Sequence, residues 1–154
     1  MKRMHVNIRV NDLAASVAYY SRLFGSAPTV EKGDYAKWML EEPRVNFALS
    51  ATSGPAGIEH LGIQVDSQEE LEALFEHTPD LKEEGETTCC YAHSNKGWSA
   101  DPQGVEWELF YTHGQSETYF GETGNAACCA PGPEGSTCCG DGAQVKTTGE
   151  AACC

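Results

Sequence analysis

The feature that most constrains the fold of this chain is an internal repeat in its first 113 residues. The segment HVNIRV (residues 5–10) aligns with HLGIQV (residues 60–65), and each begins with a histidine and then alternates apolar with polar residues. This alternation has the period of two expected of a strand with one buried face. The repeat therefore predicts two modules of the same architecture, related by an approximate twofold axis.

A helical pattern follows each of these two strands. Residues 11–25 carry apolar side chains at helical spacing with Gly25 as the stop signal, and residues 66–80 do the same with Pro79 as the terminator. Gly, Asp and Pro punctuate the sequence after each helix and separate short strand candidates. Three such candidates lie in each half, at residues 27–32, 35–41 and 44–50, and at residues 86–93, 96–100 and 105–111.

The element order is thus βαβββ, twice, which predicts an α+β fold with helices outside a curved sheet. We predict one domain over residues 1–118, with modules at about 3–52 and 58–113. Residues 119–154 are predicted to be a flexible tail. They are rich in Gly, Ala, Thr and Cys, and they carry too few large apolar side chains to offset the entropy cost of ordering.

The charge of the chain excludes several classes of partner. Asp and Glu number 23 against ten Lys and Arg, which gives a net charge of −13 and disfavours nucleic acids and anionic membranes. The start, MKRMHVNIRV, lacks the apolar core of a signal peptide, and no apolar run reaches the roughly 18 residues of a membrane span. We therefore expect a cytoplasmic monomer or homodimer.

All eight cysteines occur as adjacent pairs. A disulfide between neighbouring residues closes a strained ring, so reduced pairs in a cytosolic protein are better interpreted as ligands for soft metals or metalloids. Three pairs fall in the predicted tail and are expected to be auxiliary thiols. The pairs are Cys89–Cys90, Cys128–Cys129, Cys138–Cys139 and Cys153–Cys154.

A candidate metal site emerges from comparing the two halves. His5 and His60 open equivalent strands, and Glu108 on the last strand aligns with Ala48 in the first half. Two histidines and one carboxylate, with the fourth equivalent position vacant, match the facial triad of non-haem iron(II) oxygenases. Glu106 has the same strand parity as Glu108 and is the rival ligand. Glu108 is preferred because of its W-E-L-F context after a DPQG turn.

The double βαβββ pattern, the histidine at the start of each module and the segment DPQGVEWELF (101–110) resemble the vicinal oxygen chelate superfamily. That superfamily includes glyoxalase I, extradiol dioxygenases, fosfomycin-resistance enzymes and bleomycin-binding proteins. The resemblance covers residues 3–113. Glyoxalase I carries a fourth protein ligand where this chain has Ala48, which argues against a glyoxalase. Extradiol dioxygenases and fosfomycin enzymes share the set of two histidines and one glutamate, so the triad does not distinguish them.

The pair Cys89–Cys90, together with the triad, resembles the ArsI-type carbon–arsenic lyases of this superfamily. The resemblance implies iron(II) at His5, His60 and Glu108, and arsenic at the two thiols. It also implies cleavage of methylarsenite and trivalent aromatic arsenicals by dioxygen, yielding arsenite. Neighbouring strand residues point to opposite faces, so both thiols reach one arsenic only if the chain turns or bulges there.

Two alternatives remain open. A cadmium- or arsenic-binding resistance protein of the related CadI kind would use the same thiols without turnover. A fosfomycin thiol transferase would need basic residues around a phosphonate, yet no Arg follows Arg44, so this alternative is disfavoured. Among the other histidines, His93 could lower the thiol pKa but is more simply interpreted as a surface histidine, and His77 and His113 are expected to be bystanders.

Overall fold

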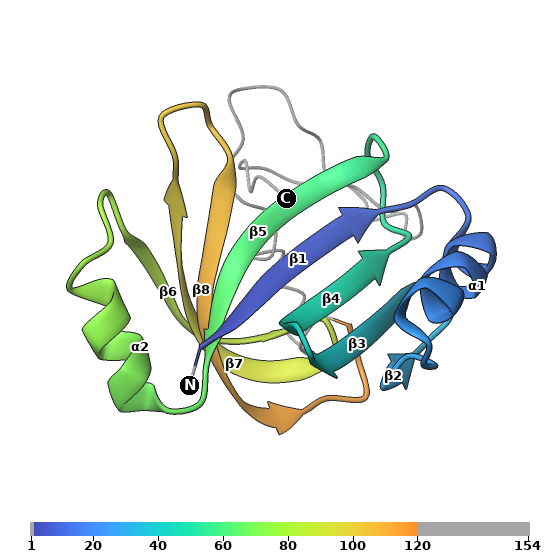
Figure 1. Cartoon of the computed structure of the whole chain (residues 1–154). Coiled ribbons are helices and arrows are strands. Elements are labelled where there is room, and N and C mark those ends of the chain that lie inside the picture. Colours follow the sequence, from blue (N-terminus) through green and yellow to red (C-terminus); the bar gives the residue numbers. More distant parts are fainter. Residues whose placement is uncertain (1, 120–154) are drawn as a thin grey trace, which may run out of the picture.

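The computed structural model describes residues 2–119, which form ten helices and strands. The predicted double βαβββ order is confirmed, and the two helices flank a single curved sheet (Figure 1). In chain order the elements are β1 (Arg3–Arg9), α1 (Leu13–Phe24), β2 (Val30–Glu31), β3 (Tyr35–Glu41), β4 (Arg44–Ser50), β5 (Gly57–Val65), α2 (Gln68–Phe75), β6 (Lys82–Cys89), β7 (Ala92–Ala100) and β8 (Glu106–Gln115).

The order of strands across the sheet is symmetric about its centre: β2-β3-β4-β1-β5-β8-β7-β6. The first strands of the two modules, β1 and β5, pair antiparallel, with His5 opposite Gly62 and Asn7 opposite His60. In the sequence repeat, His5 is equivalent to His60 and Asn7 is equivalent to Gly62, so the two pairs are equivalent to each other. The approximate twofold axis therefore crosses the sheet between them. Strand β4 runs parallel beside β1, and β8 runs parallel beside β5. The two modules are thus joined edge to edge through β1 and β5.

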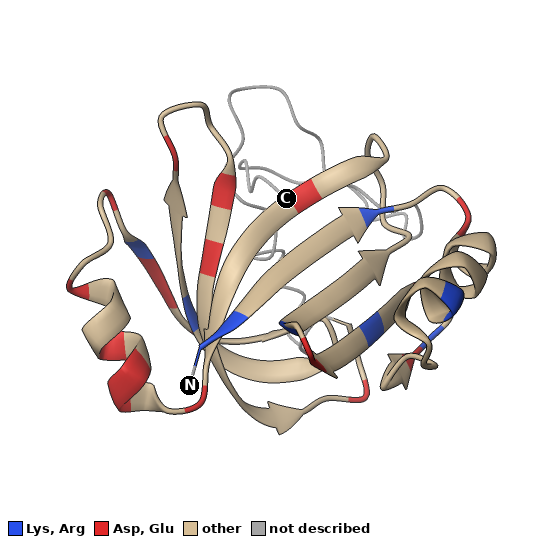
Figure 2. Cartoon of the chain, in the orientation of Figure 1, with Lys and Arg blue, Asp and Glu red and all other residues tan. Residues whose placement is uncertain are grey.

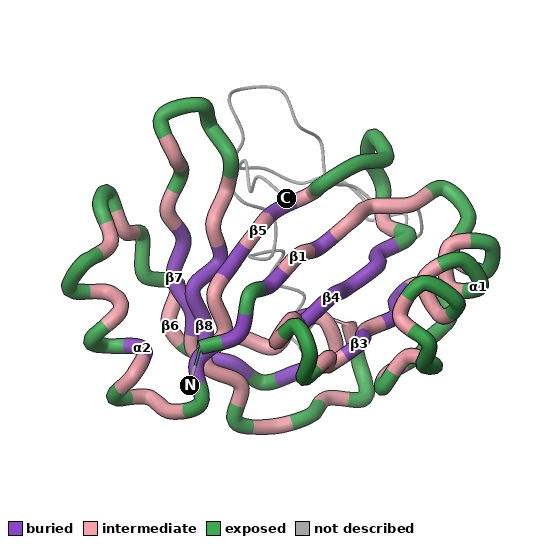
Figure 3. The backbone as a smooth tube through the Cα atoms, viewed as in Figure 1, coloured by how far each residue is buried: buried purple, intermediate pink, exposed green. Residues whose placement is uncertain are grey.

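Each helix begins at a capping side chain. Asp12 accepts a hydrogen bond from the backbone N–H of Ala15 at the start of α1, and Ser67 accepts one from Glu70 at the start of α2. Gly25 ends α1 in the left-handed conformation, with a φ of 67°. The helices cover only one face of the sheet, and most of their residues are half-buried or exposed (Figure 3).

The apolar core is divided between the modules. Trp38, Phe47 and Leu49 pack against α1, whereas Leu71 of α2 packs with Val65 and Leu109. On β1 the residues that pack toward the first core, such as Val6 and Ile8, alternate with His5 and Asn7, which line a cavity on the other face. On β1, the strand period of two thus places polar side chains on the inner face of the sheet.

The predicted strand over residues 86–93 is wrong in one important respect, because a hairpin turn interrupts it. Strand β6 ends at Cys89, and β7 begins at Ala92 and runs through residues 96–100. Cys90 and Tyr91 form the two-residue turn, with φ values of 56° and 61°. Two consecutive positive φ values define a type I′ turn, which usually contains Asn or Gly, so the sequence carries no signal for it.

Some predictions fall outside the described residues. The tail cysteines Cys128, Cys129, Cys138, Cys139, Cys153 and Cys154 lie there, as does nearly all of the predicted flexible tail. Within residues 2–119, neither helix has the length and apolar character needed to cross a bilayer.

The close approach of β5 to β8 makes a prediction about Gly62. A Cβ at this position would overlap the backbone carbonyl oxygen of Glu108. We expect Gly62→Ala to lower the free energy of unfolding by about 1–3 kcal/mol, because two paired strands must separate locally. Urea denaturation measures the change. Gly33→Ala is the matched control, since a Cβ there meets no atom within 4 Å. Equal stability of both variants would contradict the prediction.

Candidate metal centre

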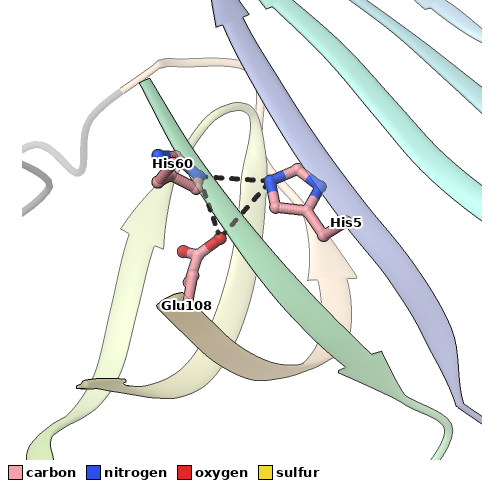
Figure 4. Close-up of side chains that lie close together, drawn as sticks. All are labelled: His5, His60 and Glu108. Carbon is pink, nitrogen blue, oxygen red and sulfur yellow. Dashed lines mark hydrogen bonds and ion pairs between the residues drawn. The ribbon is translucent and has the colours of Figure 1, made fainter. Parts of the chain in front are cut away.

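The structure brings His5, His60 and Glu108 together from three adjacent strands, β1, β5 and β8. The Nε2 atoms of the two histidines are 3.2 Å apart. The Oε2 atom of Glu108 lies 3.6 Å from His5 Nε2 and 3.4 Å from His60 Nε2. Figure 4 shows the three side chains pointing toward one another. All three are buried, with exposed fractions of 5%, 9% and 6%.

The spacing of these donor atoms fits a single metal ion. Donors about 2.1 Å from one ion lie about 3.0 Å apart at right angles and about 3.4 Å apart in a tetrahedron. Two imidazoles and one carboxylate suit a divalent first-row metal and leave coordination positions open. Ala48 pairs with Asn7 in the first module as Glu108 pairs with Gly62 in the second, so this equivalent position offers no donor.

The ring of His5 is held in the tautomer that a metal ligand needs. Its Nδ1 lies 3.0 Å from the backbone carbonyl oxygen of Asn46, which can only accept a hydrogen bond. Nδ1 therefore carries the proton, and the Nε2 lone pair faces His60 and Glu108. Burial lowers the pKa of His5 to about 4, against an opposing effect of Glu108, so the imidazole is neutral at pH 7.

A buried lysine that the sequence analysis missed orients the carboxylate. Lys96 Nζ donates a hydrogen bond to Glu108 Oε1 at 2.6 Å, which leaves Oε2 facing the histidines. Burial opposes the ionisation of Glu108, but Lys96 and the histidines outweigh it and hold the pKa of Glu108 well below its usual value. By strand register Lys96 is the counterpart of Tyr35, so the carboxylate and its counter-ion both occur in the second module only. The sequence signal for Lys96 was its position on the strand, because alternation places it on the inward-facing side together with Ser94 and Trp98.

The rival carboxylate lies elsewhere. Glu106 pairs across the sheet with Ala100 and is half-buried. Among residues 2–119, the only group of three or more His, Cys, Asp or Glu donors close enough to share an ion is His5, His60 and Glu108.

The type I′ turn places the two thiol side chains together, as a shared ligand would require. The Sγ atoms of Cys89 and Cys90 are 3.0 Å apart, and both residues line the same cavity as His5 and Glu108. At about 30 Å³ this cavity holds no more than one or two water molecules, so a larger ligand must displace side chains at its mouth.

The two cysteines are in different states. Cys90 is a free thiol whose pKa burial raises to about 11, although the charge of Lys96 opposes this. Cys89 is disulfide-bonded. A soft ligand would therefore require reduction of Cys89 and would displace the Cys90 proton.

The other histidines lie away from the cavity. His93 does not serve the thiols as suggested, because it is exposed and contacts Thr88 at 2.8 Å, whereas its neighbours Ala92 and Ser94 line the cavity. His77 and His113 are also exposed.

Three tyrosines from separate segments lie around Cys90, and no sequence motif marks them. The ring centroids of Tyr35, Tyr91 and Tyr119 lie 5.5–5.9 Å apart. Cys90 Sγ donates to the hydroxyl oxygen of Tyr119 at 3.5 Å, and Tyr91 donates to Asp34 at 2.6 Å. Cys90 therefore contacts this tyrosine cluster and also lines the cavity that His5 and Glu108 share.

The lowered pKa of His5 predicts how the stability of the metal-free protein depends on pH. Between pH 6.5 and about 4, the unfolded chain binds a proton at His5 that the native protein does not, so stability falls as pH falls through this window. The loss attributable to His5 is roughly 3 kcal/mol. Urea denaturation of the wild type and His5→Gln at pH 7 and pH 4 measures it. Parallel pH dependence in the two proteins would contradict the assignment.

The Lys96–Glu108 pair predicts that a metal can replace a lost ammonium group. Lys96→Met leaves a buried carboxylate without its cation, which costs about 3–5 kcal/mol in comparable cases. We expect a lower Tm for this variant without metal and a larger rise in Tm on adding a divalent metal than in the wild type. Thermal denaturation with and without metal tests this, with exposed Lys82→Met as the control. A smaller metal-induced rise in Lys96→Met would refute it.

Comparisons with known proteins agree with this architecture. A family model described as the Glyoxalase/Bleomycin resistance protein/Dioxygenase superfamily matches residues 2–109. A solved structure of homoprotocatechuate 2,3-dioxygenase from Brevibacterium fuscum, in complex with 3,4-dihydroxyphenylacetate, superposes with a TM-score of 0.56. The match has 17% identity and covers 76% of this chain and 38% of that one, so it supports the fold alone.

Two relatives match along nearly the whole chain. The trivalent organoarsenical cleaving enzyme of Bacillus sp. (strain MD1) is 42% identical over 151 residues, covering 90% of this chain and 91% of that protein. The cadmium-induced protein CadI of Mycobacterium tuberculosis (strain ATCC 25618 / H37Rv) is 33% identical over 154 residues, covering 97% and 100%. With the match to the family model, these similarities establish that the chain belongs to the glyoxalase/bleomycin resistance protein/dioxygenase superfamily.

Proposed function

We propose that this protein is an iron(II)-dependent dioxygenase that cleaves the carbon–arsenic bond of trivalent organoarsenicals and releases arsenite. The observation that carries the proposal is that His5, Glu108, Cys89 and Cys90 line one cavity. A site for a first-row metal and a site for a soft metalloid thus lie side by side. The name of the Bacillus sp. relative supports an enzyme acting on organoarsenicals.

The chain's own groups have separable roles in this proposal. His5, His60 and Glu108 hold the metal, with Lys96 keeping one carboxylate oxygen away from it. When bound, iron(II) supplies open coordination positions and the electrons that activate dioxygen. Because burial lowers the pKa of His5 to about 4, this imidazole needs no deprotonation before it binds a metal at neutral pH.

The presence of two thiols explains why the proposed substrate is an organic arsenical and not inorganic arsenite. Trivalent arsenic has three substituents, so an arsenical that keeps its carbon has two positions left for Cys89 and Cys90. Each thiol displaces one hydroxyl group from the arsenic, and that hydroxyl leaves as water with the cysteine proton, while the carbon–arsenic bond stays inside the cavity. With methylarsenite the overall reaction balances without a further reductant: methylarsenite and dioxygen give arsenite and formaldehyde.

A binding protein without turnover is the second candidate. The CadI relative favours it, because its name records induction by cadmium and no reaction. Such a protein would bind the same arsenical or a soft metal at Cys89 and Cys90 and release nothing. Detection of product therefore separates the two functions.

The deciding experiment loads the reduced full-length protein with iron(II) under anaerobic conditions and then adds methylarsenite and dioxygen. We expect arsenite and formaldehyde in equal amounts, with one dioxygen consumed for each. Stoichiometric binding of methylarsenite without either product would support the binding protein instead. Mn(II) and Co(II) loading in parallel shows which metal the site uses.

Two variants test the assigned roles. Glu108→Ala should lose iron binding and turnover together, because it removes one of three ligands. Cys90→Ser should keep iron binding but lose arsenical binding and turnover. Glu106→Gln is the matched control for the carboxylate and should retain both activities, since Glu106 lies outside the cavity lining. Loss of iron binding in Glu106→Gln but not in Glu108→Ala would reverse the assignment.

A further inference from the structure

A second, larger cavity adjoins the one that holds the thiols. Its volume is about 540 Å³, which is in the range of small-molecule sites. Lys37, Ala92 and Thr112 line both cavities, so these residues form the wall between them. The larger cavity passes between the β2–β3 edge and the strands β7 and β8. Tyr91 and Ala92, which directly follow Cys90 in the chain, line this larger cavity.

Lys37 stands out among the cations of the structure. Five Lys or Arg residues in the range 2–119 are buried or half-buried, and four of them form an ion pair with a carboxylate. Lys37 is the fifth, and no carboxylate of the described residues lies within ion-pair distance of it. The four paired cations are Arg3 with Glu41, Arg9 with Glu59, Arg44 with Asp66, and Lys96 with Glu108.

A partly desolvated ammonium without a counter-ion is costly, and an anion from outside would relieve that cost. Burial lowers the pKa of Lys37, and the charge of the nearby Cys90 only partly offsets this effect. The rest of the molecule attracts anions poorly: the net charge is −13, and acidic residues cluster on α2 (Figure 2). A second cation, Lys32, lines the same cavity, with its ammonium 5.3 Å from the ring centroid of Tyr91. Glu31 is also on the lining, where it is exposed.

We propose that Lys37 forms an anion subsite, which binds a carboxylate or similar single negative charge carried into the larger cavity with the arsenical. The inference rests on the proposed function and narrows its substrate class to arsenicals presented with an anionic group. Lys37 contacts both cavities, so it can pair with such a group while Cys90 binds the arsenic. A neutral methyl group on arsenic leaves this subsite unused.

The anion has two possible sources with the same chemistry. It belongs either to the organic substituent on arsenic or to a small thiol that delivers the arsenical. Delivery is a thiol exchange: each bond from arsenic to a carrier sulfur is replaced by a bond to Cys89 or Cys90. The cysteine proton leaves on the carrier thiol, and no oxidation or reduction occurs.

The test measures binding to the reduced, metal-free, full-length protein, so that it does not depend on turnover. Phenylarsenous acid and 4-carboxyphenylarsenous acid are titrated by calorimetry, and the ratio of their Kd values is compared between variants. We expect the wild type to bind the carboxylated compound about tenfold more tightly, as for a charged hydrogen bond. Lys37→Met should abolish this preference and Lys37→Arg should retain it. Lys82→Met is the control for a distant lysine.

A second arm follows the rate at which phenylarsenic is transferred from thioglycolate or from 2-mercaptoethanol. A Lys37-dependent preference for thioglycolate in rate, without a carboxylate preference in Kd, supports the subsite and places the anion on the carrier. No Lys37-dependent preference in either arm overturns the inference. Equal weakening of neutral and anionic ligands in Lys37→Met also overturns it, because Lys37 would then act on the thiols.

The outcomes also separate this inference from the proposed function. If none of the arsenicals binds, both the anion subsite and the proposed function are contradicted. If the protein shows a Lys37-dependent preference for the anionic compound but makes no arsenite, the subsite is supported and only the catalytic proposal is contradicted. If the protein turns over methylarsenite but shows no such preference, the catalytic proposal is supported and the subsite is contradicted.

Discussion

The antiparallel pairing of β1 with β5 is the constraint on which the rest of the structure depends. It joins two modules that each supply an incomplete site and fixes the register in which His5 and His60 approach within 3.2 Å. It also sets the neighbours of these strands, since β4 and β8 run parallel beside them. Gly62 is part of the same constraint, because only a residue without a Cβ lets β8 bring Glu108 close enough.

The site departs from twofold symmetry at the carboxylate ligand and at the cation that pairs with it. The second module contributes Glu108 and its counter-ion Lys96 at positions where the first has Ala48 and Tyr35. The result is a candidate metal centre in which the second module supplies the carboxylate and its counter-ion, and the equivalent position of the first module offers no donor. Lys96 connects this centre to the thiol pair, since its charge acts on both Glu108 and Cys90. The hard carboxylate and the soft thiols thus remain distinct ligand sets within one cavity.

Much of this could be predicted from the sequence, for identifiable physical reasons. The repeat predicted the double module and the equivalence of His5 with His60, because strand parity and register follow from period-two patterning. The turn at Cys90 and Tyr91 could not be predicted, since both residues adopt positive φ without the Gly or Asn that marks such turns. Lys96 and Lys37 were also missed, because a lysine in a strand is usually solvated and only register places these two inward.

The central claim is that a metal at the triad and an arsenic at the thiol pair occupy one cavity together. The most direct measurement is a crystal structure of the reduced, metal-loaded protein with phenylarsenous acid, using anomalous scattering at the metal and arsenic edges. The account predicts one metal peak among His5 Nε2, His60 Nε2 and Glu108 Oε2, and one arsenic peak bonded to both Cys89 Sγ and Cys90 Sγ. A metal bound by the cysteines, or arsenic bound only by thiols outside the cavity, would contradict it.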